Sequence, residues 1–372
     1  MIVWMGANAI PPVDIAAATA ASSVEIATHS EQLSLDALAL LEVAGRRNVE
    51  CGPAWFALLA KHLFPENASW LILRQRDKCQ AVWPVQSGRP AGAMSSYYTA
   101  LYAPSHSADV SSSSLVELAR ALRKGRLNAG VHYFSPMDPD CVEFEAMESA
   151  LTQAGFVTLR YFRFVNWYLP CQGLIWSQYF AERKGALRNT VRRMGKKLMA
   201  EDGKLEIITG GDRLAAGLAA YERVYAASWK QSEPFPGFVR ELMVLCAQQG
   251  WLRLGVAWLG DFAIAAQFWI VAHGRAEIFK VAYDEAYKVH TAGTLLTAAL
   301  MEHVLDHDRV SEVDYLIGDD PYKKTWMSHR RERWGIAAYN PRTVSGLVGL
   351  TRHFAGQLKR RWWPRSQPDT NV

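Results

Sequence analysis

The segment between residues 276 and 324 holds the residues whose types and spacing suggest chemistry. Its pattern predicts a strand over Ala276–Tyr283, a helix over Thr294–Leu305 and a second strand over Val313–Ile317. The loop before the helix, Lys288–Thr294, reads Lys-Val-His-Thr-Ala-Gly-Thr. A helix leaves its first N–H groups unpaired and carries partial positive charge there. This loop is therefore predicted to cradle an anion, and a diphosphate is its natural ligand.

Individual residues of the loop have defined places in this cradle. Gly293 lets a ligand approach the backbone closely, and Thr291 or Thr294 can cap the helix. Lys288 and His290 add positive potential. Thr and Gly before a helix are also ordinary capping chemistry, so the loop by itself leaves both interpretations open.

The elements before the loop favour the phosphate interpretation. Trp251–Val271 reads as two strands joined at Gly260 and Asp261, the composition of a two-residue hairpin turn. The order is therefore a meander of three strands, a phosphate-type loop with its helix, and a further strand. This is the core order of the GNAT acyltransferases.

The span from about Ser177 to Asn340 resembles the GNAT-like acyltransferase family, which includes cellulose-biosynthesis-associated and Fem-type acyl-CoA N-acyltransferases and BioF-like acetyltransferase domains. The motifs that carry the resemblance are RNTVRR at 188–193, Tyr283-Asp284, HTAGTLL at 290–296, DYLIG at 314–318 and YKKTW at 322–326.

The resemblance implies an α/β (α+β) fold in which two GNAT-like mixed-sheet units share a cleft. A weak internal repeat agrees: VHYFSPMDP from Val131 aligns with VDYLIGDDP from Val313, an offset of 313 − 131 = 182 residues. The expected divisions are a loosely ordered lead-in over 1–30, a degenerate GNAT-like domain over 31–170, the acyltransferase domain over 171–343, and a basic amphipathic helix and tail over 344–372. The first half has no counterpart of Gly293, so one cofactor site is expected.

The resemblance also implies acyl-CoA as co-substrate and no metal. In such folds a main-chain N–H on the fourth strand bonds the thioester carbonyl, and Val281 is the central candidate here. The predicted cofactor-binding residues are Lys280, Val281, His290, Thr291, Ala292, Gly293 and Thr294.

Polar side chains near the strand ends are the candidates for catalysis, namely Asp284, Tyr283, Asp319 and Lys323. Asp284 or Asp319 is expected to accept the proton of the attacking group, directly or through water. Lys323 would orient an acidic group or neutralise an anionic substrate. The alternative for Lys323 and Asp314 is a buried ion pair that shapes the loop.

Substrate contacts are predicted at Arg188, Arg192, Trp229, Asp314 and Tyr322. Arg188 and Arg192 are four residues apart and share one helix face, which is either a solvated face or an anion site. Trp229 either packs in the core or roofs the acceptor pocket.

The predicted function is transfer of an acyl group from acyl-CoA to an amine or hydroxyl. The acceptor is expected to be a small molecule, or a saccharide or lipid-linked precursor of a polysaccharide or of the cell envelope. One alternative is a Fem-type transferase that uses aminoacyl-tRNA. The other is a non-catalytic factor for envelope or polysaccharide assembly.

Bulk composition sets the remaining limits. The chain has 372 residues, half of them hydrophobic, without an apolar run long enough to span a membrane. Five cysteines without CxxC spacing favour a reducing cytoplasm. A net charge of +5 does not indicate a dedicated nucleic-acid binder. His303 and His307 are four apart but lack a third ligand, so no metal site is predicted.

The C-terminal segment 345–363 is amphipathic and ends in basic residues and in Trp362 and Trp363. It either caps the domain or makes peripheral contact with the inner membrane surface, with the two tryptophans as interfacial anchors.

Overall fold

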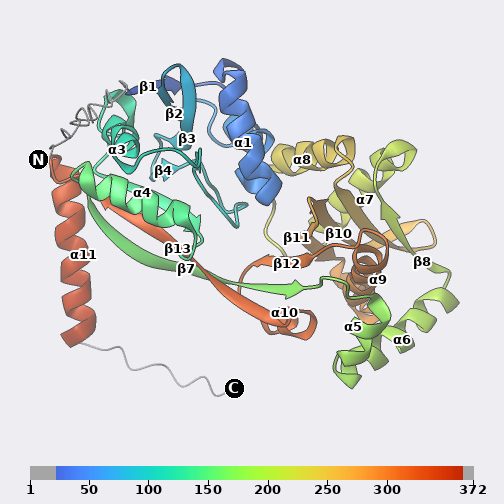
Figure 1. Cartoon of the computed structure of the whole chain (residues 1–372). Coiled ribbons are helices and arrows are strands. Elements are labelled where there is room, and N and C mark those ends of the chain that lie inside the picture. Colours follow the sequence, from blue (N-terminus) through green and yellow to red (C-terminus); the bar gives the residue numbers. More distant parts are fainter. Residues whose placement is uncertain (1–21, 363–372) are drawn as a thin grey trace, which may run out of the picture.

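The computed structural model describes the backbone of residues 22–362 and the side chains of residues 22–355. Its strands form one 13-stranded mixed sheet in the order β1-β2-β3-β4-β6-β13-β7-β12-β11-β10-β9-β8, with short β5 paired to β3. Figure 1 shows the two halves of the molecule connected by the long strands β7 and β13.

The first half alternates strands and helices along the chain. Its strands are β1 (Ser22–Ala27), β2 (Ala68–Gln75), β3 (Lys78–Gln86), β4 (Ala91–Ala93), β5 (Ser105–His106), β6 (Val131–Met137) and β7 (Val157–Pro170). Its helices are α1 (Leu35–Arg47), α2 (Pro53–His62), α3 (Ser112–Ala121) and α4 (Val142–Gln153).

The second half begins with two additional helices and then repeats the pattern. Its strands are β8 (Gly203–Ile208), β9 (Leu252–Leu259), β10 (Phe262–Ala272), β11 (Arg275–Tyr283), β12 (Glu312–Ile317) and β13 (His329–Tyr339). Its helices are α5 (Trp176–Glu182), α6 (Gly185–Ala200), α7 (Leu214–Ala226), α8 (Pro236–Gln248), α9 (Ala292–Asp306), α10 (Pro321–Trp326) and α11 (Val344–Trp362).

The internal repeat predicted from the sequence is present in the topology. The order β1-α1-α2-β2-β3-β4-α3-β6-α4-β7 recurs as β8-α7-α8-β9-β10-β11-α9-β12-α10-β13. In both copies the strand after the central helix is parallel to the strand before it, as β4 is to β6 and β11 is to β12. The segments at 131 and 313 fall on the equivalent strands β6 and β12.

The two sheets are continuous, which corrects the expectation of two separate units. The last strand of each half pairs with the other half: β7 lies beside β12, and β13 lies between β6 and β7. The predicted division at residue 171 falls directly after β7. It does not separate two sheets, because residues 329–339 complete the first-half sheet.

Apolar packing also joins the halves. Trp55 of α2 packs edge-on against Phe238 of α8 and Phe279 of β11, with ring centroids 5.5 and 6.0 Å apart. These buried rings belong to a core cluster that extends from β1 to β13. Residues of both halves therefore line the cleft between them, and this packing holds the base of the cleft in place.

The predicted lead-in needs a second correction. Ser22–Ala27 forms the edge strand β1, which pairs with β2 over six positions. Alternation in SSVEIA is short, and pairing with residues 43 to 53 positions later in the chain stabilises the strand. Residues 1–21 lie outside the described part of the chain.

The C-terminal segment is helical from Val344 to Trp362, as predicted. Its apolar residues Val344, Leu347 and Phe354 are exposed. The side chain of Trp362 and all of Trp363 lie outside the described residues, so the membrane contact stays a prediction. No helix in residues 22–362 has the length and hydropathy needed to cross a bilayer.

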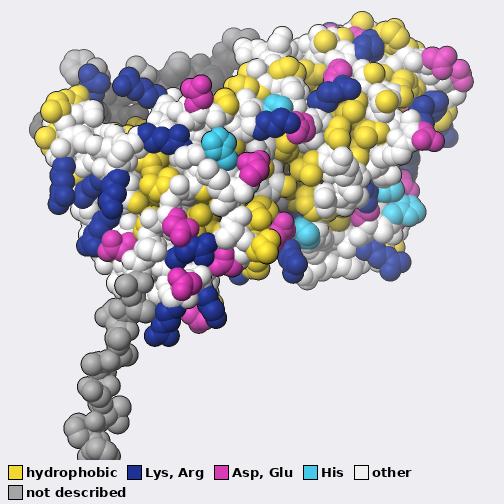
Figure 2. All heavy atoms as spheres, turned by 90° about the horizontal axis from the view of Figure 1, so that it is seen from above, with side chains coloured by type: hydrophobic (Ala, Val, Ile, Leu, Met, Phe, Trp, Pro, Cys, Tyr) yellow, Lys and Arg dark blue, Asp and Glu magenta, His cyan; other side chains and the backbone are white. Residues whose placement is uncertain are grey.

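Charged side chains of both signs are interspersed over the face shown in Figure 2. Among the described residues no continuous basic stripe crosses this face. The arrangement agrees with the modest net charge of +5.

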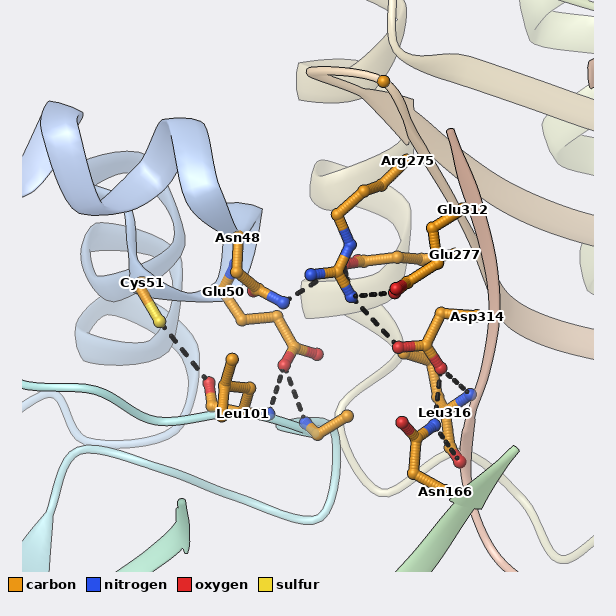
Figure 3. Close-up of polar contacts among 12 residues, drawn as sticks. Asn48, Glu50, Cys51, Leu101, Asn166, Arg275, Glu277, Glu312, Asp314 and Leu316 are labelled. Atoms are coloured by element: carbon orange, nitrogen blue, oxygen red, sulfur yellow. Dashed lines mark hydrogen bonds and ion pairs between the residues drawn. The ribbon is translucent and has the colours of Figure 1, made fainter. Parts of the chain in front are cut away.

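A buried polar cluster lies where the halves meet (Figure 3). Glu50, from the short turn Val49–Cys51, is fully buried, and its carboxyl accepts the N–H groups of Ala100 and Leu101 at 2.8 and 2.6 Å. Beside it Glu277 of β11 is also buried and accepts a hydrogen bond from Asn48 at 3.3 Å. Burial raises the pKa of both carboxyls, that of Glu277 to about 7.

Candidate active site

A cavity of about 740 Å³ opens between β11, β12 and the beginning of α9. Its walls also include the loop before α8 and a loop of the first half. The lining residues are Tyr97, Tyr98, Trp229, Lys230, Gln267, Ile278, Phe279, Lys280, Val281, Ala282, Tyr283, Lys288, Thr291, Ala292, Gly293, Thr294, Tyr315, Leu316, Ile317, Asp320, Tyr322 and Lys323.

The cavity exists because β11 and β12 separate. They pair in parallel only where Arg275–Glu277 meets Glu312–Asp314. Beyond that point β12 is irregular: Leu316 has φ +51°, and the register with β7 shifts between Asp314 and Ile317. The backbone edge of β11 over residues 278–283 is therefore unpaired on the side of β12. An extended amide-bearing ligand can add to such an edge as a strand does.

Strand β11 contains a bulge, and beyond it Lys280 and Val281 point to opposite faces of the sheet, as successive residues of a strand do. Ile278 pairs with Trp269 and Lys280 with Phe268, so Phe279 is the extra residue. Lys280 points toward the first half, where its Nζ lies 3.0 Å from the Tyr97 hydroxyl. Val281 packs against the cluster that contains α9. The cavity thus has a side near α9 and a side near the first half.

The first turn of α9 is the place where the sequence predicts an anion cradle. Thr291 is its N-cap in the left-handed region, with φ +48°, and its side chain makes no capping bond. Its carbonyl accepts the N–H groups of Thr294 and Leu295, whereas those of Ala292 and Gly293 have no partner among the described residues. The Thr291 hydroxyl oxygen is buried, and it too lacks a partner there. These donors fit an anionic oxygen.

Buried side chains hold this turn in place. Gln267 of β10 donates to the Gly293 carbonyl at 2.7 Å and to the Thr297 hydroxyl at 2.9 Å. Its own carbonyl accepts the indole N–H of Trp269 at 2.9 Å. The turn is therefore fixed to the sheet before any ligand arrives, which preserves the donor positions.

Most predicted cofactor residues line the cavity, and one does not. Lys280, Val281 and the run Thr291–Thr294 are at its wall. His290 faces away, with its Nδ1 3.3 Å from a carboxyl oxygen of Glu201. The short helix Glu285–His290 turns its side chain toward the end of α6, and Lys288 takes its place at the cavity.

Among the four predicted catalytic residues, Tyr283 and Lys323 line the cavity. Asp284 does not, which corrects its assignment as a base. It is buried, accepts the N–H of Ala286 at 3.0 Å and pairs with Arg223 at 3.3 Å. Asp319 also lies outside the cavity wall, where its carboxyl accepts the Trp167 indole N–H at 2.6 Å.

The predicted substrate residues are likewise divided. Trp229 and Tyr322 line the cavity, and Trp229 stacks at 4.5 Å on Tyr283. Asp314 is buried in ion pairs with Arg275 and Arg331 at 3.0 and 2.5 Å. Neither Arg188 nor Arg192 on α6 is among the lining residues, and Arg192 is exposed. Of the two alternatives for Asp314, the buried ion pair is the correct one, with arginine partners rather than Lys323.

Lys323 stabilises the irregular end of β12. Its buried ammonium donates to the carbonyls of Tyr315, at 2.9 Å, and Ile317. Burial lowers the pKa of this lysine. The sequence predicted that Lys323 contacts the acceptor substrate. Its hydrogen bonds show that Lys323 shapes the opening between β11 and β12.

We therefore expect Lys323→Met to impair both stability and ligand binding. The carbonyl of buried Tyr315 would lose its donor, at a cost of about 1–3 kcal/mol, the carbonyl of Ile317 would lose a partly buried one, and the cavity wall would relax. Urea denaturation and calorimetric titration with coenzyme A measure the two effects. Lys324→Met, at an exposed neighbouring position, is the control. Unchanged stability with only a weaker acceptor interaction would restore the original assignment.

Sequence reasoning missed the wall on the first-half side. Tyr97 and Tyr98 donate to one carboxyl oxygen of Glu233 at 2.8 and 2.6 Å, and Lys280 donates to the other at 2.6 Å. Burial opposes ionisation, but these bonds hold the pKa of Glu233 below its ordinary value. The adjacent tyrosines carried no recognisable motif, because their partners are more than 130 residues away.

Comparison with known proteins agrees with this geometry. Residues 185–324, from α6 to α10, match the family model described as an acetyltransferase (GNAT) domain. No curated protein matches the chain.

Solved structures show the same fold at low identity. A tandem GNAT protein from the clavulanic acid biosynthesis pathway has 12% identity and a TM-score of 0.50, over 86% of this chain and 100% of that one. FemX has 9% identity and a TM-score of 0.52, over 79% and 96%. A conserved protein from Bacteroides thetaiotaomicron has 13% identity and a TM-score of 0.52, over 82% and 95%. The tandem GNAT-like α/β fold is thus confirmed.

Proposed function

We propose that this chain is an acyltransferase that moves an acyl group from acyl-CoA to the amine or hydroxyl of an acceptor. The main evidence is that two features lie side by side at one cavity. The unpaired edge of β11 can bind the amide-bearing arm of the donor, and the free N–H groups at the start of α9 can bind its diphosphate.

The residues present fit such a donor. A Cβ built on Gly293 would meet only the ring of Tyr283, at 3.7 Å, so the space before the turn is open to a ligand. The buried, unpartnered Thr291 hydroxyl offers a further polar contact. Lys288 contributes positive charge at the same wall.

The chain would then perform three tasks. The β11 backbone near Val281 positions the thioester and donates to its carbonyl oxygen as charge develops. The Tyr322 hydroxyl, at the cavity and 3.3 Å from that of Thr297, is placed to give a proton to the leaving sulfur. The side near the first half, with Tyr97, Trp229 and Lys230, receives the acceptor.

A saccharide or lipid-linked precursor remains the proposed acceptor class. Tyr97 and Trp229 support it, because they line the cavity and are more than half exposed, at 54% and 52%. Such rings offer an apolar face to a sugar.

Gly293→Val tests the donor site. The side chain would fill the space needed by the diphosphate, while the open surroundings should leave the fold intact. We expect at least about a tenfold loss of coenzyme A affinity, equivalent to about 1.4 kcal/mol, with an unchanged melting temperature. Calorimetric titration measures the affinity.

The matched control is Gly195→Val on α6, where an added Cβ meets nothing within 4 Å. It should bind coenzyme A as the parent does. The proposal fails if the parent binds no coenzyme A and purifies without a thioester detectable by mass spectrometry. That result would favour the alternative of a non-catalytic assembly factor. If Gly293→Val and the parent bind coenzyme A with equal affinity, the diphosphate does not bind at the start of α9.

A further inference from the structure

One cation at the cavity, Lys230, lacks a direct ion-pair partner among the described residues. The side chain of Lys230 lines the wall directly before α8, and its ammonium makes no hydrogen bond or ion pair with the residues that the structure describes. Its nearest aromatic neighbours are the rings of Trp229 and Tyr225, at 5.6 and 5.8 Å. Burial, and secondarily the charge of Lys280, lowers the pKa of Lys230 to about 8.

The carboxylates near the cavity are already engaged. Both oxygens of Glu233 are occupied, by Lys280 and by the two tyrosines. Asp320, at the other wall, caps α10 by accepting the Tyr322 N–H at 2.9 Å. Asp284, buried against Arg223, cannot reach an acceptor without losing that pair. Among the lining residues beside Trp229 an acceptor therefore meets the Lys230 amine and no carboxylate, and Glu285, outside the lining, interacts with Tyr283.

Several charged groups act on Lys230. From its own loop Glu233 favours the ammonium, whereas Lys280 of β11 and Lys323 of α10 oppose it. Tyr225 of α7 and Trp229 contribute rings without charge. Two like charges and burial outweigh one opposite charge, and a lysine in such surroundings is available as a neutral amine near neutral pH.

We propose that Lys230 is the general base of the transfer, taking the proton of the acceptor's attacking nitrogen or oxygen. The inference rests on the proposed acyl transfer. As that atom forms its bond to the thioester carbonyl carbon, the carbon–sulfur bond breaks and the sulfur leaves with its electron pair. The proton moves to Lys230 Nζ, and the resulting ammonium returns it to solvent. Lys280 and Glu233 set the charge around the amine.

Chemical labelling tests this without knowledge of the acceptor. The full chain is reacted with acetic anhydride from pH 6 to pH 11, and the modified peptides are quantified by mass spectrometry. Lys230 should reach half-maximal reactivity near pH 8, well before exposed Lys78 in the same sample. Coincident curves for the two lysines would overturn the proposal.

Two variants should move the labelling curve of Lys230 in opposite directions. Lys280→Met removes a like charge and should raise the pKa of Lys230. Glu233→Gln removes the opposite charge and should lower that pKa. These shifts test the charge environment of Lys230, and the turnover of the variants tests its role in the transfer. Absence of both shifts contradicts the assigned electrostatics.

Turnover separates a base from an anion-binding cation. With acetyl-CoA as donor and glucosamine or water as acceptor, Lys230→Met should lose about 10²–10⁴-fold in rate. Lys230→Arg keeps the charge but cannot accept the proton, so it should be equally impaired. A Lys230→Arg variant with the activity of the parent would overturn the assignment of Lys230 as the base. Coenzyme A affinity should persist in both variants, and its absence in the parent would instead count against the acyltransferase proposal.

Discussion

Replacement of Arg331 by Met should lower the free energy of unfolding by up to about 3–5 kcal/mol, because the buried Asp314 and the partly buried Glu312 each lose one of the two arginines that they contact. The guanidinium of Arg331 on β13 lies 2.8 Å from Glu312 and 2.5 Å from Asp314, both on β12. It also donates to Asn166 of β7 at 2.5 Å. Burial opposes the charge of Asp314, but Arg331 and Arg275 hold its pKa below its ordinary value.

This network lies where the two halves exchange strands, so its loss should affect the whole sheet. Urea denaturation measures the change, with Arg330→Met as the control. The Arg330 side chain is half exposed and lies as far as 3.9 Å from Asp319. Such an ion pair is expected to contribute little to the free energy of unfolding. A stable Arg331→Met protein with weakened substrate binding would instead support the substrate-contact prediction for Asp314.

The sequence predicted the elements whose signals are local. The hairpin at Gly260 has φ +54° at that residue, as a two-residue turn requires. Helix α9 was predicted from apolar spacing, and Leu295, Leu296 and Leu300 are buried as expected. The anion cradle could be proposed from the sequence because its glycine, its threonines and the start of its helix lie within seven consecutive residues.

Features that depend on distant partners could not be predicted in this way. Asp284 is a local cap and an ion-pair partner at once, and its arginine lies 61 residues earlier. The insertion of β13 between β6 and β7 depends on pairing, which β-propensity does not specify. Lys230 stands beside the predicted Trp229, but its position at the cavity wall without a direct ion pair among the described residues is visible only in three dimensions.

The buried carboxyls where the two halves meet should make the free energy of unfolding depend on pH (Figure 3). Burial raises the pKa of Glu277 from 4.5 to about 7, and the charge of Asp314 adds to this although Arg275 opposes it. Between these two pH values the folded chain keeps a proton that the unfolded chain has lost. This contribution to the free energy of unfolding is therefore fully present below pH 4.5 and is lost as pH rises through 7.

His132 contributes with the opposite sign, so the total curve is not diagnostic. Burial lowers the pKa of His132 to about 4. The unfolded chain therefore binds the extra proton between pH 4 and 6.5, and stability rises with pH there. The difference between parent and Glu277→Gln cancels this term.

We expect Glu277→Gln, which imitates the protonated side chain, to match the parent near pH 4, below the pKa of the unfolded state. It should exceed the parent by an amount on the order of 3 kcal/mol at pH 8. Urea denaturation at both pH values measures the difference, and Glu66→Gln at an exposed site should show none. Parallel curves for parent and Glu277→Gln would mean that Glu277 ionises normally.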